Sequence, residues 1–406
     1  MAIKRRTPIG KLLVAVWLLL CSLPVSARTD SVRVSRWDTL PDVLFDVKVK
    51  TSNKQSTPPK DNFWRRMFAG HIDRTFERKF DYSLVVVPSW SREGSVGLGG
   101  MAAALYRLDR GDSSLAPSDV SLSANASLKG FFYVGALGNT YFKGGRSRLK
   151  YELSFSQKKL NFWGISYDFC DVHPAINYTR WRVKADAFYD YRVYDGLYVG
   201  AALNIGYNSI VKIDDVAYLE GQKDAYFTTG LGLSLQYDTR NNISYPTKGW
   251  NVLFRQMVYP GVFGNCDRTL WRSTVTVDYY QRLWRGGVLA FDLYGELNSK
   301  DAPWALREEA GGIYRLRGYY AGRYIDNNIV SLQMEVRQKL FWRVGLAAFI
   351  GCGSVFPSFQ EWRWNHLLPS GGVGLRFEFK HNLNLRVDYG FGRGTSGFVL
   401  SLGESF

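Results

Sequence analysis

Residues 329–340 alternate between apolar and polar side chains, and this period of two constrains the fold more than any other feature of the sequence. Over residues 330–337 the chain reads Val-Ser-Leu-Gln-Met-Glu-Val-Arg. Because successive side chains of a β-strand point to opposite faces, one face of this strand is apolar and the other is polar and charged. The same pattern recurs from Tyr82 to Phe406. It favours a membrane β-barrel, whose apolar side faces lipid and whose polar side faces a water-filled lumen.

The recurring alternation predicts an all-β fold, a 16-stranded antiparallel transmembrane β-barrel, and an even strand number is usual for bacterial single-chain barrels. Most connections after even-numbered strands are short and are expected in the periplasm, whereas most long connections follow odd-numbered strands. The predicted strands cover residues 82–90, 96–108, 120–127, 131–142, 148–157, 180–193, 197–210, 225–238, 250–258, 270–283, 287–298, 329–340, 344–356, 372–379, 383–391 and 397–406.

The first part of the chain has the pattern of a secretory signal peptide over residues 1–27. A basic start precedes the short apolar core of residues 12–20, and Ala27 ends a run of small residues suited to cleavage. This apolar core is too short for a membrane-spanning helix, although an uncleaved anchor helix is the alternative. Residues 28–80 are expected to form a periplasmic tether with a basic amphipathic helix over residues 64–76. Residues 81–406 form the predicted barrel.

The formal net charge of +16 indicates which partners such a chain would contact. An exported basic protein with many aromatic residues is attracted to anionic lipid head groups, so outer-membrane lipids including lipopolysaccharide are expected partners. Nucleic acid is the usual alternative for a basic chain, and the export signal argues against it. The amphipathic helix would lie on the inner leaflet, cap the barrel mouth, or simply pack on the barrel.

Motifs of soluble enzymes are missing from the sequence, so we expect no catalytic residues, no cofactor and no metal. The four histidines are scattered, and no Cys-x-x-Cys pair occurs. A catalytic dyad assembled across strands, as in barrel lipases and proteases, is an alternative that a sequence does not reveal. Cys170 and Cys266 fall in predicted outward loops, where a disulfide between them is an open question, and Cys352 is expected to face lipid.

Three segments resemble the BamA/TamA-type outer-membrane assembly barrels, the family built on the bacterial surface antigen domain. One of them is similar to the periplasmic turn motif of that family. It runs from Asp-Thr-Arg-Asn to Tyr-Pro-Thr-Lys-Gly-Trp and includes Asp238, Arg240, Tyr245, Pro246 and Gly249. Pro246 supplies a fixed bend and Gly249 a flexible exit, as many turns require.

A second segment, Leu-Arg-Gly-Tyr, resembles the tip of the long inward-folding loop of the family. The resemblance implies that Arg317 anchors this loop inside the barrel, with Gly318 and Tyr319 beside it and Glu335 as its acidic partner. A second acidic group would fall on the following strand, where Gly351 stands instead. The anchor is therefore expected to be weaker, or to depend on Glu335 alone.

The third segment is the end of the chain, which resembles the last strand of the family and its C-terminal recognition signal. Its residues are Phe398, Leu400, Leu402, Gly403 and Phe406. The resemblance implies a role in inserting or assembling membrane proteins through a seam between the first and last strands.

The seam would be weakened by Pro88, which removes a hydrogen-bond donor from the first strand, and by Gly403 in the last strand. Client barrels or other outer-membrane assembly proteins would then be partners. Residues 28–81 are too few for a periplasmic POTRA module, so we expect a member without one. The competing function is a passive channel or a structural barrel.

Overall fold

The computed structural model describes residue 75 and residues 79–91, 95–112, 115, 117–243, 245–300, 302–380 and 383–406. The predicted signal peptide and tether lie outside the described residues, as does nearly all of the predicted helix over residues 64–76. These assignments therefore stay predictions, as does the expected lack of a POTRA module.

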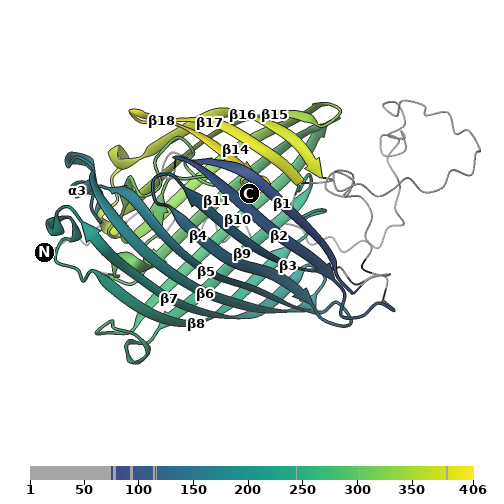
Figure 1. The fold of residues 1–406 in the computed structure, drawn as a ribbon, viewed down its shortest axis with the longest axis horizontal. Coiled ribbons are helices and arrows are strands. Elements are labelled where there is room, and N and C mark those ends of the chain that lie inside the picture. Colours follow the sequence, from purple (N-terminus) through teal and green to yellow (C-terminus); the bar gives the residue numbers. More distant parts are fainter. Residues whose placement is uncertain are drawn as a thin grey trace, which may run out of the picture. The chain divides into compact units, whose positions relative to one another are not determined.

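Sixteen strands form one antiparallel sheet, and they are paired in the order in which they occur in the chain (Figure 1). The predicted fold class is confirmed, and three strands, β8, β11 and β15, have the predicted bounds. The strands are β1 (Asp81–Ser91), β2 (Ser95–Tyr106), β3 (Ser118–Ser127), β4 (Phe132–Tyr141), β5 (Ser147–Phe162), β6 (Ile176–Tyr194), β7 (Leu197–Ile213), β8 (Ala225–Asp238), β9 (Gly249–Tyr259), β10 (Leu270–Trp284), β11 (Gly287–Asn298), β14 (Asn328–Phe341), β15 (Val344–Phe356), β16 (Leu368–Lys380), β17 (Leu383–Gly392) and β18 (Thr395–Leu402).

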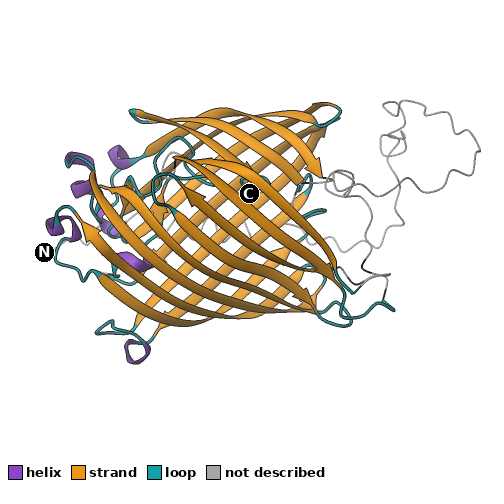
Figure 2. Ribbon diagram, in the orientation of Figure 1, coloured by secondary structure: helices purple, strands orange, loops and turns teal. Residues whose placement is uncertain are grey.

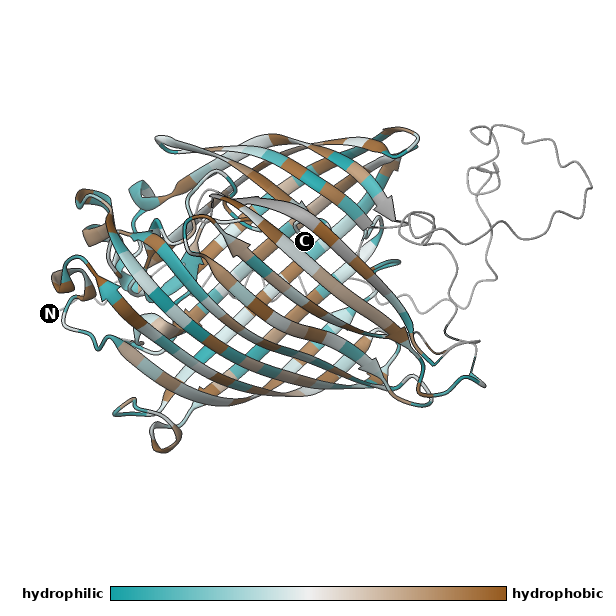
Figure 3. Cartoon of the chain, viewed as in Figure 1, coloured by the Kyte–Doolittle hydropathy of each residue, from teal (hydrophilic) through white to brown (hydrophobic). Residues whose placement is uncertain are grey.

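The two faces of the sheet differ as the alternation predicts. On β14, Glu335 and Arg337 are buried, whereas Leu332 and Met334 are each 38 % exposed. Figure 3 shows hydrophobic and hydrophilic residues alternating along the strands. The apolar face therefore points outward, toward the position that lipid would occupy, and the charged face lines the lumen.

The two ends of the barrel differ in their connections, and the helical turns gather at one end (Figure 2). These turns are α3 (Tyr167–Val172), η2 (Val216–Leu219), η3 (Gly261–Phe263), η5 (Phe359–Glu361) and η6 (Trp364–His366). At this end β5 and β6 extend further than predicted, to Phe162 and from Ile176. Among the described residues, no helix combines the length and the apolar character that crossing a membrane would require.

The connection between β11 and β14, residues 299–327, folds back into the barrel. It contains η4 (Trp304–Leu306) and a small hairpin of β12 (Glu309–Ala310) with β13 (Tyr324–Ile325). Leu306 packs against Ala202 of β7 and Met257 of β9, which are buried residues of the barrel wall. Wall side chains and loop side chains thus share one core, and that core fixes the position of the loop.

The first and last strands lie next to each other, but the described residues show no hydrogen-bonded ladder between them. β1 pairs with β2, and β18 pairs with β17 (Figure 1). β18 is also shorter than predicted: it ends at Leu402 rather than at Phe406. Gly403 has a φ of 82°, a conformation that glycine adopts without strain, and there the chain leaves the sheet.

Candidate functional site

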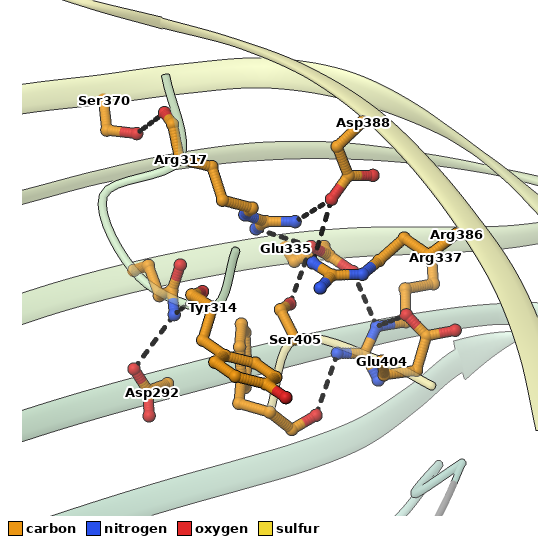
Figure 4. Close-up of polar contacts among 12 residues, drawn as sticks. Asp292, Tyr314, Arg317, Glu335, Arg337, Ser370, Arg386, Asp388, Glu404 and Ser405 are labelled. Atoms are coloured by element: carbon orange, nitrogen blue, oxygen red, sulfur yellow. Dashed lines mark hydrogen bonds and ion pairs between the residues drawn. The ribbon is translucent and has the colours of Figure 1, made fainter. Parts of the chain in front are cut away.

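Side chains from three strands, the inward-folding loop and the C-terminal tail meet in one buried cluster of charges (Figure 4). The cluster contains Arg317 from the loop, Glu335 and Arg337 from β14, Arg376 from β16, Arg386 and Asp388 from β17, and Glu404 from the tail. Alternation along each strand places these side chains on the inner face. The curvature of the wall turns the inner faces of β14, β16 and β17 toward a common point, which the loop and the tail then fill.

Arg317 is the centre of this cluster. Its Nη2 lies 2.7 Å from Oε2 of Glu335, and its Nη1 donates to Oδ2 of Asp388 at 2.7 Å. The guanidinium also lies 3.5 Å from the centroid of the Phe349 ring, an arrangement that adds a cation–π attraction. Both carboxylates and the arginine are fully buried. A buried pair of this kind is costly to break, because removal of one partner strands the charge of the other.

Glu335 is shared among several cations. Its Oε1 accepts from Nε of Arg337 at 2.8 Å and from Nη2 of Arg376 at 3.0 Å, while Oε2 faces Arg317. Asp388 likewise accepts from Arg376 at 2.5 Å and from Arg386 at 3.0 Å. Arg376 and Arg317 both contact the two carboxylates, so the anchor of the loop is one connected network rather than an isolated pair.

The backbone at the tip of the loop lies directly against β17. Gly318 has a φ of 108°, and a Cβ there would lie 2.7 Å from the backbone carbon of Gly390. Ser370 of β16 donates to the carbonyl of Arg317 at 2.7 Å, and the Tyr319 hydroxyl donates to the carbonyl of Pro369 at 2.8 Å. The Leu-Arg-Gly-Tyr segment is therefore held through the side chains of Arg317 and Tyr319 and through the backbone carbonyl of Arg317.

Two further arginines hold the residues just before the tip. Arg315 makes two hydrogen bonds to Asp292 of β11, from Nε at 3.0 Å and from Nη2 at 2.9 Å. Arg386 donates to the carbonyl of Ile313 at 2.7 Å. Paired hydrogen bonds between guanidinium and carboxylate fix orientation as well as distance. The loop is thus attached to β11 on one side and to β17 on the other.

The C-terminal tail, residues 403–406, follows β18 and enters the same cluster. Glu404 accepts from Nε of Arg376 at 2.9 Å and from Nδ2 of Asn384 at 2.6 Å. Ser405 donates to Glu335 at 3.3 Å, and Arg337 donates to the carbonyl of Phe406 at 3.2 Å. The Phe406 ring lies near the Tyr280 ring and the Arg337 guanidinium and is therefore inside the barrel, whereas a continued strand would have kept these residues in the wall. Phe398 and Leu400 stay in β18 with Phe398 outward, and Leu402 is its last residue.

The predicted turn motif connects β8 to β9, and its Tyr245 lies near the arginine–carboxylate cluster. Asp238 accepts two side-chain hydrogen bonds from Arg240, at 2.9 and 2.8 Å, which close the turn. Tyr245 lines a cavity of about 90 Å³ together with Arg337 and Arg376, and the adjacent Pro246 is buried. Gly249 begins β9 with a φ of 111°. The structure thus places the turn, the loop and the tail around one site.

The two residues assigned to the seam lie in different surroundings. Pro88 lies within β1, opposite Leu98 of β2. Pro88 has no backbone N–H to donate to a neighbouring strand, and β2 is the one partner of β1 among the described residues. Gly403 lies just after β18, and its backbone amide donates to the carbonyl of Asn384 at 2.8 Å. Gly403 therefore redirects the tail and does not loosen the interior of the strand.

Comparison with known proteins supports this architecture. A family model described as the Omp85 superfamily domain matches residues 119–406, well over half of the chain. The chain belongs to the Omp85 superfamily. It is an outer-membrane β-barrel protein, and the resemblance noted in the sequence is confirmed. A search of the curated proteins gave no match to this Omp85 chain.

Solved Omp85 barrels share the fold at low sequence identity. The crystal structure of BamA from Haemophilus ducreyi lacking POTRA domains 1–3 has a TM-score of 0.55 and 11 % identity, and the match covers 80 % of this chain and 70 % of that one. CdiB from Escherichia coli has a TM-score of 0.54 and 12 % identity, covering 80 % and 62 %. CdiB from Acinetobacter baumannii has a TM-score of 0.53 and 11 % identity, covering 80 % and 60 %. The chain thus spans less than two thirds of either CdiB protein.

The structure corrects one expectation about the anchor of this Omp85 barrel. Arg317 does not depend on Glu335 alone, because Asp388 of β17 supplies a second carboxylate. A side chain at Gly351 has no room, since a Cβ there would lie 2.6 Å from the carbonyl oxygen of Leu332. Asp388 lies on the inner face of β17, and the curvature of the wall brings β17 opposite the loop tip.

The remaining sequence-based expectations concern cysteines and metals. Cys170, Cys266 and Cys352 are free thiols in the structure, and Cys170 is buried. Burial raises the pKa of the Cys170 thiol to about 12, so this group is a poor nucleophile at neutral pH. Within the described part of the chain, no group of three or more His, Cys, Asp and Glu side chains is arranged to hold a metal ion.

Proposed function

We propose that this Omp85 barrel aids the assembly of outer-membrane proteins by opening its seam between β1 and β18. The family membership and the resemblance to BamA/TamA-type assembly barrels support partners among other outer-membrane proteins and client barrels. The observation that carries the proposal is the lack of a described hydrogen-bonded ladder between the first and last strands, although the fourteen strands between them are paired on both sides. An unpaired strand edge is a template on which a client strand can pair by β-augmentation.

The site described above gives the seam a defined inner support. The loop tip reaches β18, where Thr395 donates to the carbonyl of Gly318 at 3.3 Å. The tail after β18 is tied to Arg376 and Arg337 inside the barrel. The arginine cluster therefore holds the last strand from the inside of the barrel.

A photo-crosslinking amino acid placed in β1 tests this proposal in living cells. Leu84 is 56 % exposed on the outer face of β1, and Leu233 of β8 is 68 % exposed on the same face far from the seam in the strand order. We expect the Leu84 position to capture client or partner barrels, identified by mass spectrometry, and the Leu233 position to capture none. Products that join Leu84 to β18 of the same chain, and no others, would contradict the proposal.

The alternative function is a passive channel, which a polar cavity of about 380 Å³ inside the lumen favours. Conductance in planar bilayers separates the two functions. Large, steady openings would indicate a channel, whereas the anchored loop predicts a barrel that is mostly closed. Contact of the outer face with lipopolysaccharide is also part of the proposal, and it rests on the positive net charge.

A further inference from the structure

The cavity of about 380 Å³ is separate from the arginine–carboxylate cluster, and more cationic than acidic side chains line it. Strands β6 to β11 line it together with the inward-folding loop. Six cationic side chains line this cavity, against three carboxylates, those of Asp186, Glu296 and Glu308. The cations are Arg182, Lys184, Arg255, Arg272, Arg307 and Arg315.

Ion pairs balance most of this charge, because Arg182 lies 3.5 Å from Glu309 and Arg315 lies 2.9 Å from Asp292, two carboxylates just outside the cavity lining. Lys184 lies 2.9 Å from Asp186, and Arg272 lies 3.4 Å from Glu296. The Glu308 side chain is accessible from the lumen, but the barrel wall surrounds it. Desolvation by the wall and repulsion from the Glu296 carboxylate raise the pKa of Glu308 to about 7. Part of the negative charge of Glu308 is therefore absent at neutral pH.

Arg255 of β9 is a lining cation for which the described residues provide no ion-pair partner, since Asp190 and Asp186 act on it only at longer range. Among the described residues, no acidic group lies within ion-pair distance of its guanidinium, and its buried Nε has no hydrogen-bond partner. The guanidinium stacks 3.9 Å from the centroid of the Phe188 ring, which holds it in place. The buried Nε of Arg272 on the next strand also has no partner. Unpaired buried donors of this kind are costly unless a ligand satisfies them.

We propose that this cavity is a binding site for a phosphate-type oxyanion, with Arg255 as its principal donor. Guanidinium groups bind phosphate oxygens through paired, charge-assisted hydrogen bonds, and a low-dielectric lumen strengthens such contacts. The oxyanion is either free in solution or part of a lipid head group. Both sources offer the same chemistry to Arg255, so the experiment must separate them.

The direct test is calorimetric titration of the purified barrel, in an uncharged detergent, with inorganic pyrophosphate. We expect saturable binding at one site, and a loss of affinity of about tenfold or more in Arg255→Gln. Arg255→Lys keeps the charge and should retain most of the affinity. Lys150→Gln removes a lumen charge outside the cavity, where Lys150 lies 3.8 Å from Asp190, and should bind like the wild type.

Two results would overturn the site: no saturable binding to the wild type, or equal weakening in Arg255→Gln and Lys150→Gln. Electrophoretic mobility without heating, which folded barrels alter, confirms that each variant is folded. A second titration uses nanodiscs of uncharged lipid with and without phosphatidic acid. If phosphatidic acid competes with pyrophosphate in the wild type, the natural ligand is a lipid head group. If it does not compete, the site takes a soluble oxyanion.

Discussion

The guanidinium of Arg317 lies 2.7 Å from the carboxylate of Asp388, although the two residues are 71 positions apart in the chain. Arg317 belongs to the inward-folding loop and Asp388 to the penultimate strand of the barrel. This contact joins the loop to the part of the wall that borders the seam. Stability of the loop and of the last strands should therefore change together, and this coupling can be tested.

Replacement of Arg317 by alanine should destabilise the barrel strongly. It removes both ion pairs of Arg317 and leaves Glu335 and Asp388 buried with less compensation, which typically costs about 3–5 kcal/mol. The midpoint of heat-induced unfolding, followed by gel mobility, should fall well below that of the wild type. Arg363→Ala is the control, because Arg363 is 56 % exposed and pairs with an exposed Asp168. Equal midpoints for the two variants would refute the anchor.

Replacement of Gly318 by alanine should displace the loop tip. Alanine is strained at a φ of 108°, and its Cβ would meet the backbone of Gly390 at 2.7 Å, so we expect a cost of roughly 2 kcal/mol or more. Gly394→Ala also places an alanine at a positive φ, of 63°, but its Cβ would have open space. It should cost only about 1 kcal/mol. Limited proteolysis of residues 299–327 measures the difference, and similar cleavage rates in both variants would argue against close packing at the tip.

Replacement of Glu404 by alanine should release the C-terminal tail from the lumen. The variant loses the hydrogen bonds that Glu404 accepts from Arg376 and Asn384. In a Ser405→Cys background, a water-soluble maleimide should then label position 405 several-fold faster, once labelling of the native cysteines is subtracted. Glu361→Gln, an exposed loop change, serves as the control. An unchanged labelling rate would mean that Glu404 does not hold the tail.

The docking of the loop should weaken in acid through Glu309. Desolvation raises the pKa of this group, but Arg180 and Arg182 outweigh it and lower the pKa to about 2. A carboxyl group whose pKa is lowered by folding stabilises the folded protein at pH values above its unfolded pKa of about 4.5. This stabilisation is lost as the pH falls toward about 2. Glu309→Gln should therefore destabilise the barrel by about 3 kcal/mol at pH 7, and the difference from the wild type should shrink between pH 4.5 and 2. A constant difference over that window would contradict this account.

Most of the wall could be predicted because the period of two is a local property of each strand. Residues 330–337 alternate in sequence, and the structure buries Glu335 and exposes Leu332 as expected. The predicted ends of β5 and β6 were wrong because both strands continue past the apolar band. Beyond that band the residues 158–162 no longer need an apolar outer face, so the alternation signal fades while the hydrogen-bonded ladder continues to Phe162.

The site was harder to predict, because it depends on curvature and on chain reversal. Arg317 and Glu335 follow from a family resemblance, but Asp388 comes from three strands further along the sheet. Glu404 was expected in a continuing strand, and only the left-handed backbone of Gly403 shows that the tail turns inward. A glycine followed by a glutamate at the end of an otherwise alternating strand is the one signal that was available.

Hydrogen exchange of the backbone amides, measured on the barrel in lipid nanodiscs, tests the proposed seam most directly. The lack of a described ladder between β1 and β18 predicts that amides of these two strands exchange at least about tenfold faster than amides of β8 and β9, which are paired on both sides. Protection of β1 and β18 equal to that of β8 and β9 would show a sealed wall and contradict the proposed opening.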